Sequence, residues 1–453
     1  MNPTPELSGA FLRLLDVEQL RSLIRMEIRQ RGEEGFDVNG LRESLDEQNS
    51  TEELVRLYNE LLEARRAREF AYSEPETLNE IRRLRPDGPR RAAVRNDPAI
   101  LFDRIRGGWL GRVSGCVLGK PVEPFGYWGK IAEYLKLSNN YPLSHYITRL
   151  DPLPNDFPID PMVKGNFFGE FSGAPEDDDT DYTILALHVL ETYGLDFRTE
   201  DVAAEWLGHL AYHKTWTAER TTYRNLVLGI PPLDARRFLN PEREYIGARI
   251  RVDAYGMAVP GNPEFAAQLA YRDAALSHTK NGIYSAMFTA ACIAWAFVTD
   301  DIEEIIHAGL SEIPANCRQA EAIREVLAVH QEVADWQSAY ERLLEKWASL
   351  NPTHAINNTA LMALALLYGN GDFGKTICTA VMCGFDTDCN AANAGTVLGI
   401  LSGAQALPDK WTRPLNDTLH SAVSQFGEMR ISELAQRMAA IAGNYLSDSS
   451  SKE

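Results

Sequence analysis

Helical periodicity, repeated from about residue 100 to residue 445, is the feature that most constrains this chain. Apolar residues recur at spacings of three and four in one stretch after another, for example in residues 183–193 and 281–298. Runs that alternate apolar and polar residues are scarce, and few turn signals typical of β-hairpins occur. The sequence therefore predicts an all-α fold, a compact multi-helix globule.

The charge balance argues against several classes of function. The 453 residues include 45 Lys and Arg against 64 Asp and Glu, so the formal net charge is −19. A general nucleic-acid binder needs a basic face, and docking on an anionic membrane also needs positive charge. The longest apolar-leaning stretch, residues 286–298, is too short to span a bilayer.

The N-terminus and the cysteines favour a cytoplasmic location. No basic segment precedes an apolar run at the N-terminus, so we expect no signal peptide. The six cysteines are scattered without a C-x-x-C pair, which suits buried thiols in a reducing compartment.

Residues 1–99 differ from the rest because they are dense in Arg, Glu and Leu. Ser50 and Glu53 have the spacing of a capping box, and apolar residues at helical spacing follow through residue 64. An earlier helix is expected over about residues 12–28, and residues 73–98 form a linker. This helical N-terminal extension either packs against the main body or offers a contact surface to another protein.

Two further segments lack a helical pattern. Residues 141–171 form a long loop with five prolines, and such loops are usually functional or flexible. The prolines are Pro142, Pro152, Pro154, Pro158 and Pro161. At the other end, residues 446–453 are expected to be a disordered tail.

An acidic cluster, EDDDTD at residues 176–181, opens an amphipathic helix. A second cluster, GFDTDCN at residues 384–390, opens a helix of small residues in which glycine recurs every fourth position. Each cluster alone is typical of an acidic helix cap, since the helix dipole favours carboxylates at the N-terminus. Brought together across the 207 residues from Asp179 to Asp386, they would form a hard-oxygen site for Mg²⁺, Mn²⁺ or Ca²⁺, with two ions to balance the charge.

The third element is a glycine-spaced helix at residues 107–119, with Gly111, Gly115 and Gly119 on one thin face. Lys120 and Pro121 end this helix, and Glu123 follows on a loop. The order of residues does not match a phosphate-binding P-loop. By its chemistry alone, Glu123 is one acidic residue among many and is typical of a surface charge.

Taken together, these three elements resemble the ADP-ribosylglycohydrolase family over about residues 100–445. The shared motifs are the G-x-x-x-G-x-x-x-G-x-P-x-E start, the D-D-T cluster and the G-x-D-T-D-x-x-A-A-x-x-G close. The resemblance implies an all-α catalytic domain with two Mg²⁺ ions, Mn²⁺ being an alternative, that hydrolyses N- or O-glycosidic bonds of ADP-ribose. Residues 1–99 lie outside it.

The resemblance also implies roles for individual residues. The metal-ligand set would be Asp177, Asp178, Asp179, Asp386, Asp388 and Cys389. Asp177 and Cys389 are departures, because the family usually has Thr or Ser at both places, and a thiol is a poor partner for Mg²⁺. Cys116 also stands where the family often has Asp.

Among these residues we expect Asp178 or Asp386 to accept a proton from water, and Glu123 to orient the ribose or act as acid or base. His278 and Asn358 are candidate substrate contacts, although His278 at a helix end and Asn358 near a helix start also suit structural roles. Two alternatives stay open. One is a hydrolase of another N-riboside or nucleoside, and the other is a non-catalytic ADP-ribose-binding protein.

Overall fold

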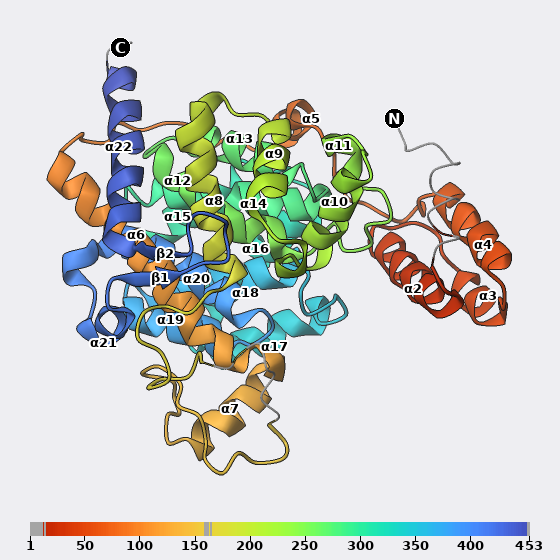
Figure 1. The fold of residues 1–453 in the computed structure, drawn as a ribbon, viewed down its shortest axis with the longest axis horizontal. Helices are drawn as coiled ribbons and strands as arrows, with labels where there is room; N and C mark the ends of the chain where they lie inside the picture. The colour runs from red at the N-terminus through yellow and green to blue at the C-terminus, as the bar shows by residue number, and fades with distance from the viewer. Residues whose placement is uncertain (1–11, 13–14, 158–162, 164, 451–453) are drawn as a thin grey trace.

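The fold is a globule of packed helices, with a small group of N-terminal helices attached at one side (Figure 1). A computed structural model describes residues 12, 15–157, 163 and 165–450. It is 65% helical with almost no strand, which confirms the predicted all-α class.

The α-helices follow one another closely along the chain. Those of the N-terminal extension are α2 (Val17–Glu33), α3 (Leu41–Glu47), α4 (Thr51–Glu63) and α5 (Leu78–Leu84). Those of the main body are α6 (Pro98–Gly119), α7 (Trp128–Leu137), α8 (Asp178–Tyr193), α9 (Thr199–His209), α10 (Thr217–Val227), α11 (Pro232–Ala235), α12 (Asp253–Ala258), α13 (Pro263–Ala274), α14 (Lys280–Trp295), α15 (Ile302–Leu310), α16 (Arg318–Glu332), α17 (Trp336–Trp347), α18 (Ala355–Gly369), α19 (Phe373–Met382), α20 (Thr387–Ser402), α21 (Asp409–Thr412) and α22 (Ile431–Ser450).

Shorter elements complete the main body. The 3₁₀ helices are η1 (Lys120–Phe125), η3 (Gly194–Asp196), η4 (Tyr212–Lys214), η5 (Ile246–Arg251), η6 (Ala404–Ala406) and η7 (Arg413–Leu415). Two short antiparallel strands, β1 (Thr418–His420) and β2 (Glu428–Arg430), pair with Leu419 opposite Met429.

The glycine-rich faces of α6 and α20 pack directly against each other. A Cβ atom added to Gly111 would lie 2.0 Å from the carbonyl oxygen of Gly395, and one added to Gly399 would lie 2.0 Å from that of Gly107. Only glycine permits so close an approach of two backbones. The contact continues to Gly119, where an added Cβ would lie 2.4 Å from the backbone nitrogen of Asp388. The glycine spacing therefore brings the end of α6 to the start of α20.

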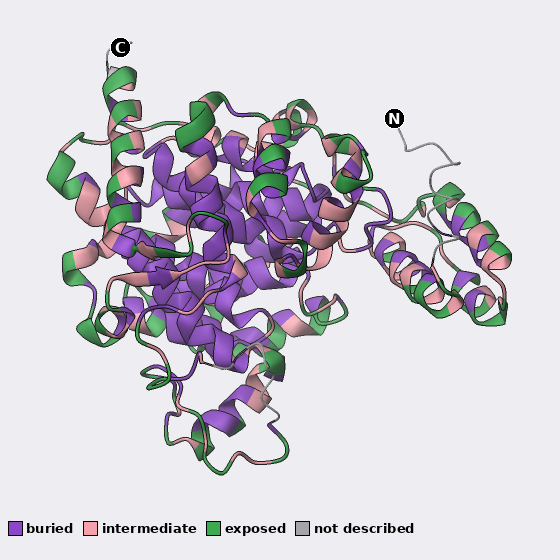
Figure 2. Cartoon of the chain, in the orientation of Figure 1, coloured by how far each residue is buried: buried purple, intermediate pink, exposed green. Residues whose placement is uncertain are grey.

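The deepest part of the core is formed by α14 and α18, in which every residue is buried (Figure 2). Such all-round burial explains why these helices are apolar on every face rather than amphipathic. The six cysteines are free and buried, as expected.

The capping box of the N-terminal extension is confirmed. Ser50 Oγ accepts the N–H of Glu53 at 3.3 Å, while Glu53 Oε2 accepts the N–H of Ser50 at 3.0 Å. The first expected helix begins and ends later than predicted, as α2. Asp16 rather than an earlier residue caps it, through its own capping box.

The extension packs against the main body of the same chain. Its apolar side chains share a small core with Ile230, Phe238 and Leu239, next to α11. Buried ion pairs strengthen the contact: Arg243 lies 2.8 Å from Glu27 and 2.7 Å from Glu34. Of the two expectations for this segment, the packing against the body is therefore the one that the structure contains.

The prediction for the proline-rich loop agrees with the structure, whereas the prediction for the C-terminal tail agrees only in part. Between α7 and α8 the described residues form no α-helix or strand, as predicted; Pro158 and Pro161 lie outside the described residues. The tail prediction was wrong in part, because α22 continues through Ser450. Serines tolerate this helical end because preceding turns of α22, with Leu434 and Met438, are anchored in the core. Residues 451–453 lie outside the described part of the chain.

Candidate active site

The first acidic cluster begins α8. Asp177 is the N-cap, and its Oδ1 accepts the N–H of Asp179 at 3.0 Å. This local bond explains why an acidic residue starts the helix here. It leaves Asp177 Oδ2, Asp178 and Asp179 to face other parts of the protein.

The second cluster begins α20 and is tied to two neighbouring elements. Thr387 Oγ donates to the carbonyl of Gly119 at 2.8 Å, at the end of α6. Asn358 Oδ1, from α18, accepts the N–H of Asp386 at 3.1 Å and an Nδ2–H of Asn390 at 2.9 Å. Asn358, which we predicted as a substrate contact, is fully buried and holds the loop that carries Asp386.

The two clusters converge in the folded protein. The thiol of Cys389 donates to Asp179 Oδ2 at 3.1 Å across the two helix starts. Three overlapping groups have possible ligand atoms within 4.8 Å of one another. These groups are Asp177 with Asp178 and Asp179, Asp179 with Asp388 and Cys389, and Glu123 with Asp386 and Asp388.

Lys120 lies among these carboxylates, and sequence reasoning missed its role. Its Nζ is 2.9 Å from Asp177 Oδ2, 3.0 Å from Asp388 Oδ2 and 3.1 Å from Glu123 Oε2. The only sequence signal was its place between Gly119 and Pro121, where we expected no more than the end of the helix. The lysine balances the negative charge of Asp177, one of the positions at which this sequence departs from the motifs it resembles.

Neighbouring charges and burial shift the pKa values of these acids in opposite directions. Burial, together with the charge of Asp388, raises the pKa of Asp386 well above its ordinary value. Burial also favours the neutral form of Asp388, but the ammonium group of Lys120 outweighs it and lowers the pKa of Asp388. Burial lowers the pKa of Lys120 itself, yet Asp177 and Asp388 reverse this and raise it. Lys120 is therefore a resident cation that neutralises only part of the cluster.

The remaining acids suit a hard metal cation. Asp386 Oδ1 is buried and has no hydrogen-bond partner among the described residues. Burial and neighbouring carboxylates raise the pKa values of Asp178 and Asp179. This shift indicates a deficit of positive charge around the two side chains. Carboxylate oxygens are the ligands that Mg²⁺ and Mn²⁺ prefer. Cys389 fits less well, because burial and Asp179 raise the pKa of its thiol and keep it protonated.

Arg112 is a second residue whose contribution was missed. It is fully buried in α6 and donates from Nη1 to Asp253 Oδ2 at 2.8 Å and from Nη2 to the carbonyl oxygen of Asp179 at 2.6 Å. These bonds fix the first turn of α8 against α6. Its place one residue after Gly111, on the helix that meets α20, was the available signal.

The predicted contact His278 lies in another buried network. Its Nδ1 is 2.8 Å from Ser277 Oγ and 4.0 Å from Glu219, which pairs with Arg251. Burial and then the charge of Arg251 lower the pKa of His278 well below its ordinary value, so the ring is neutral. These contacts favour the structural role that we left open for this residue.

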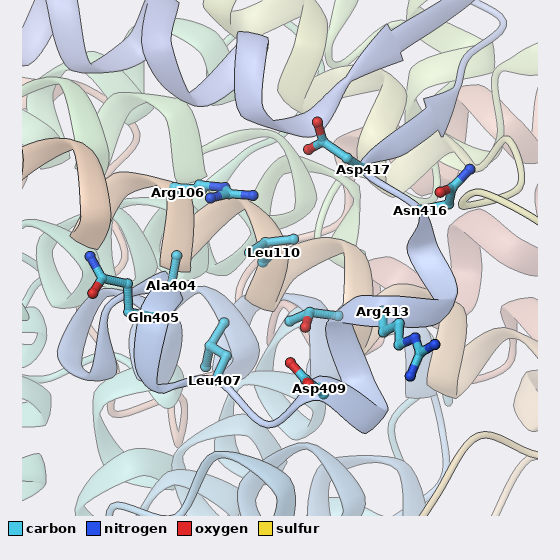
Figure 3. A pocket seen from close by; sticks show the side chains of 10 residues that line it. Arg106, Leu110, Ala404, Gln405, Leu407, Asp409, Arg413, Asn416 and Asp417 are labelled. Atoms are coloured by element: carbon cyan, nitrogen blue, oxygen red, sulfur yellow. The ribbon is translucent and has the colours of Figure 1, made fainter.

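A surface pocket of about 360 Å³ lies beside α6, away from the acids (Figure 3). Arg106 and Leu110 line one side, and Asp409 and Arg413 line the other. None of the carboxylates of the two clusters is among its lining residues. This pocket is therefore separate from the two acidic clusters.

Two helix starts that converge on buried carboxylates in an all-α globule define a helical protein with an acidic cation site. A family model described as ADP-ribosylglycohydrolase matches residues 97–445. The chain therefore belongs to the ADP-ribosylglycohydrolase family and is a glycoside hydrolase of that metal-dependent family.

Solved structures agree at the level of the fold. The chain is similar to a protein titled "ADP-ribosylglycohydrolase-related protein complex", with 20% identity and a TM-score of 0.51 over 76% of this chain and 99% of that chain. No curated protein gives a significant match. Within the described residues, no helix combines the length and the apolar character needed to cross a bilayer.

Proposed function

We propose that this protein is a metal-dependent hydrolase that cleaves the N- or O-glycosidic bond between ADP-ribose and a protein or small molecule. The observation that carries the proposal is that Asp388 shares one group of possible ligand atoms with Asp179 and another with Asp386, so helix starts more than 200 residues apart meet at buried carboxylates. Folding that many acids together costs free energy unless a cation offsets it. Capping alone would not need the two helix starts to meet.

The ligands of the divalent cation would be Asp178, Asp179, Asp386 and Asp388, which supply only oxygen donors. When bound, Mg²⁺ or Mn²⁺ would orient ribose hydroxyls and polarise the attacking water. The family resemblance implies two ions. We propose that Lys120 takes the place of one of them, since its Nζ already lies within 3.1 Å of Asp177, Asp388 and Glu123.

Hydrolysis adds water across the glycosidic bond. The water oxygen bonds to the anomeric carbon, the bond to the leaving nitrogen or oxygen breaks, and one proton passes from water to the leaving group. We propose that Asp178, which is half-buried, accepts the proton from water. The surrounding carboxylates would stabilise the oxocarbenium-like positive charge of the sugar ring.

Glu123 is the acid best placed to meet the substrate. Its side chain is 36% exposed, whereas those of Asp177 and Asp388 are 3% and 1% exposed. It lies on η1 and shares a group of possible ligand atoms with Asp386 and Asp388. We propose that it orients the ribose or serves as the acid and base of the reaction.

The first test is turnover of ADP-ribose joined to a guanidinium, a hydroxyl or an amide, with Mg²⁺ or Mn²⁺ present. We expect release of ADP-ribose by the wild type and loss of activity in Asp386→Asn. Asp409→Asn, which changes an exposed acid of α21, is the matched control and should retain activity. Thermal unfolding adds a binding readout, because a ligand at 100 times its Kd stabilises by about 2.7 kcal/mol.

A second candidate function is hydrolysis of another N-riboside or nucleoside at the same centre. Cys389 and Lys120 favour it, because they change the donors that would hold the ribose. Turnover of a nucleoside in the same panel, without turnover of any ADP-ribosyl compound, would select this candidate. Metal-independent ADP-ribose binding, equal in wild type and Asp386→Asn and without turnover, would select a non-catalytic binding protein instead. A protein contact through residues 1–99 and a cytoplasmic location stay predictions.

A further inference from the structure

A cluster of two histidines and a glutamate lies apart from the acidic site. His188 is on α8, and Glu205 and His209 are one turn apart on α9. The Nε2 atoms of both histidines lie close to Glu205 Oε2, at 3.0 Å from His188 and 3.1 Å from His209. His188 follows Asp178 by ten residues, which is about 15 Å along a helix. The two groups therefore cannot share one ion.

The hydrogen-bond partners of His209 leave its Nε2 atom opposite a carboxylate oxygen, with no hydrogen between the two atoms. Its Nδ1 lies 3.1 Å from the carbonyl oxygen of Ser424, which can only accept a hydrogen bond. In a neutral ring the proton is then on Nδ1, and the Nε2 lone pair faces the carboxylate of Glu205. Two groups of electron pairs at 3.1 Å repel each other. A metal ion between them removes the repulsion.

The surrounding contacts fix the orientations of these side chains. Tyr193 donates its hydroxyl hydrogen to Glu205 Oε1 at 2.7 Å, which fixes the carboxylate and leaves Oε2 directed at the histidines. The carbonyl of Ser424 fixes the His209 tautomer in the way that outer partners of metal-bound histidines do. The ring of Phe426 lies 5.2 Å from that of His188 and 6.1 Å from that of His209, so one side of the cluster is apolar.

We propose that His188, Glu205 and His209 bind one zinc ion. Two imidazole nitrogens and one carboxylate oxygen suit Zn²⁺ rather than Mg²⁺. With bonds of about 2.0–2.1 Å, tetrahedral ligands are about 3.4 Å apart, so the observed separations need only a small expansion to admit the ion. Water completes the fourth position.

The ion would stabilise the segment that joins β1 to β2. Ser424 donates its N–H to the carbonyl of His209 at 2.9 Å, and Ala422 donates its N–H to the Asp181 carboxylate at 3.2 Å. The segment thus links the zinc ligand His209 to the first turns of α8. The ion would lie outside the proposed catalytic chemistry of the acidic clusters.

Zinc binding is tested on the full chain after chelator treatment, with Zn²⁺ measured by equilibrium dialysis and elemental analysis. We expect one tightly held equivalent in the wild type and its loss in His188→Ala and in His209→Ala. His213→Ala is the matched control, because His213 is exposed on η4, and it should retain the ion. Asp386→Asn should also retain it, which separates this ion from any bound at the acidic cluster.

Cobalt gives a spectroscopic readout of the ligand set. Co²⁺ in the wild type and in Asp386→Asn should show the visible bands of a tetrahedral ion, and these bands should disappear in His188→Ala. Zinc should also raise the Tm of the wild type and of His213→Ala but not of His209→Ala. The proposal is overturned if the wild type holds no zinc, or if His188→Ala holds as much as the wild type.

Discussion

Lys120→Met removes the only cation that lies between Asp177 and Asp388 in the described part of the chain. The side chains of these two acids are 3% and 1% exposed, so water cannot replace the ammonium group. Removing one partner of a buried charge pair costs about 3–5 kcal/mol, since the other charge stays buried without compensation. Methionine keeps the length and volume of the side chain, so the loss reports charge rather than packing.

The expected shift in Tm follows from the size of the domain. With about 2.1 cal/mol/K of unfolding entropy per residue over residues 97–445, a loss of 3–5 kcal/mol corresponds to about 4–7 °C. Differential scanning calorimetry in chelator should find this decrease in Lys120→Met. Lys120→Arg keeps the charge and is the matched control, with a smaller decrease.

Added Mg²⁺ then separates a replaced ion from a simple ion pair. In Lys120→Met the freed carboxylates can hold a second divalent ion, so Mg²⁺ should restore most of the lost Tm. Titration calorimetry should find one more bound ion than in the wild type. If both proteins have the same Tm in chelator, or if both bind the same number of ions, Lys120 does not stand in place of a metal.

Three further changes test the packing, the extension and the metal ligands. Gly111→Ala places a Cβ 2.0 Å from a carbonyl oxygen of α20 and should lower the free energy of unfolding by at least about 1–3 kcal/mol in urea, whereas Gly208→Ala meets open space and should not; equal stability would contradict the close packing of α6 on α20. Burial raises the pKa of Glu34, but Arg243 and Lys280 outweigh it and lower the pKa to about 2. Its contribution, about 3 kcal/mol from the difference to the ordinary value, is therefore complete above about pH 4.5 and is lost as the pH falls toward 2. The protection of α2 amides from hydrogen exchange, measured relative to the unfolded-chain rate at each pH, should decrease over that range, and Glu34→Gln should remove most of this pH dependence. Asp386→Asn should weaken Mn²⁺ binding measured by electron paramagnetic resonance, and unchanged binding would exclude this residue as a ligand.

Local signals in the sequence were sufficient for much of the fold. The capping box at Ser50 and the three-and-four spacing of apolar residues depend on neighbours within one or two turns, so they predicted helices correctly. The glycine spacing predicted thin faces on two helices, because the absence of a Cβ atom is a property of the residue itself. The acidic runs at residues 176–181 and 386–388 likewise marked two helix starts.

What the sequence could not give is the set of partners that each side chain meets. The sequence predicted only that Lys120 ends a helix, because its partner Asp388 is 268 residues away along the chain. Asn358 and His278 seemed equivalent as candidates, but one holds the loop of Asp386 and the other joins the network of Arg251.

The sequence by itself determined the all-α class, the carboxylates at two helix starts and the glycine faces that allow close packing. Tertiary structure alone decided that these starts converge, that Lys120 enters the cluster and that His188 meets Glu205 and His209. The physical reason is the distance along the chain over which each kind of interaction acts. Helix formation and capping depend on residues within a few positions, whereas charge and coordination depend on distances between atoms that only the packing of distant helices sets.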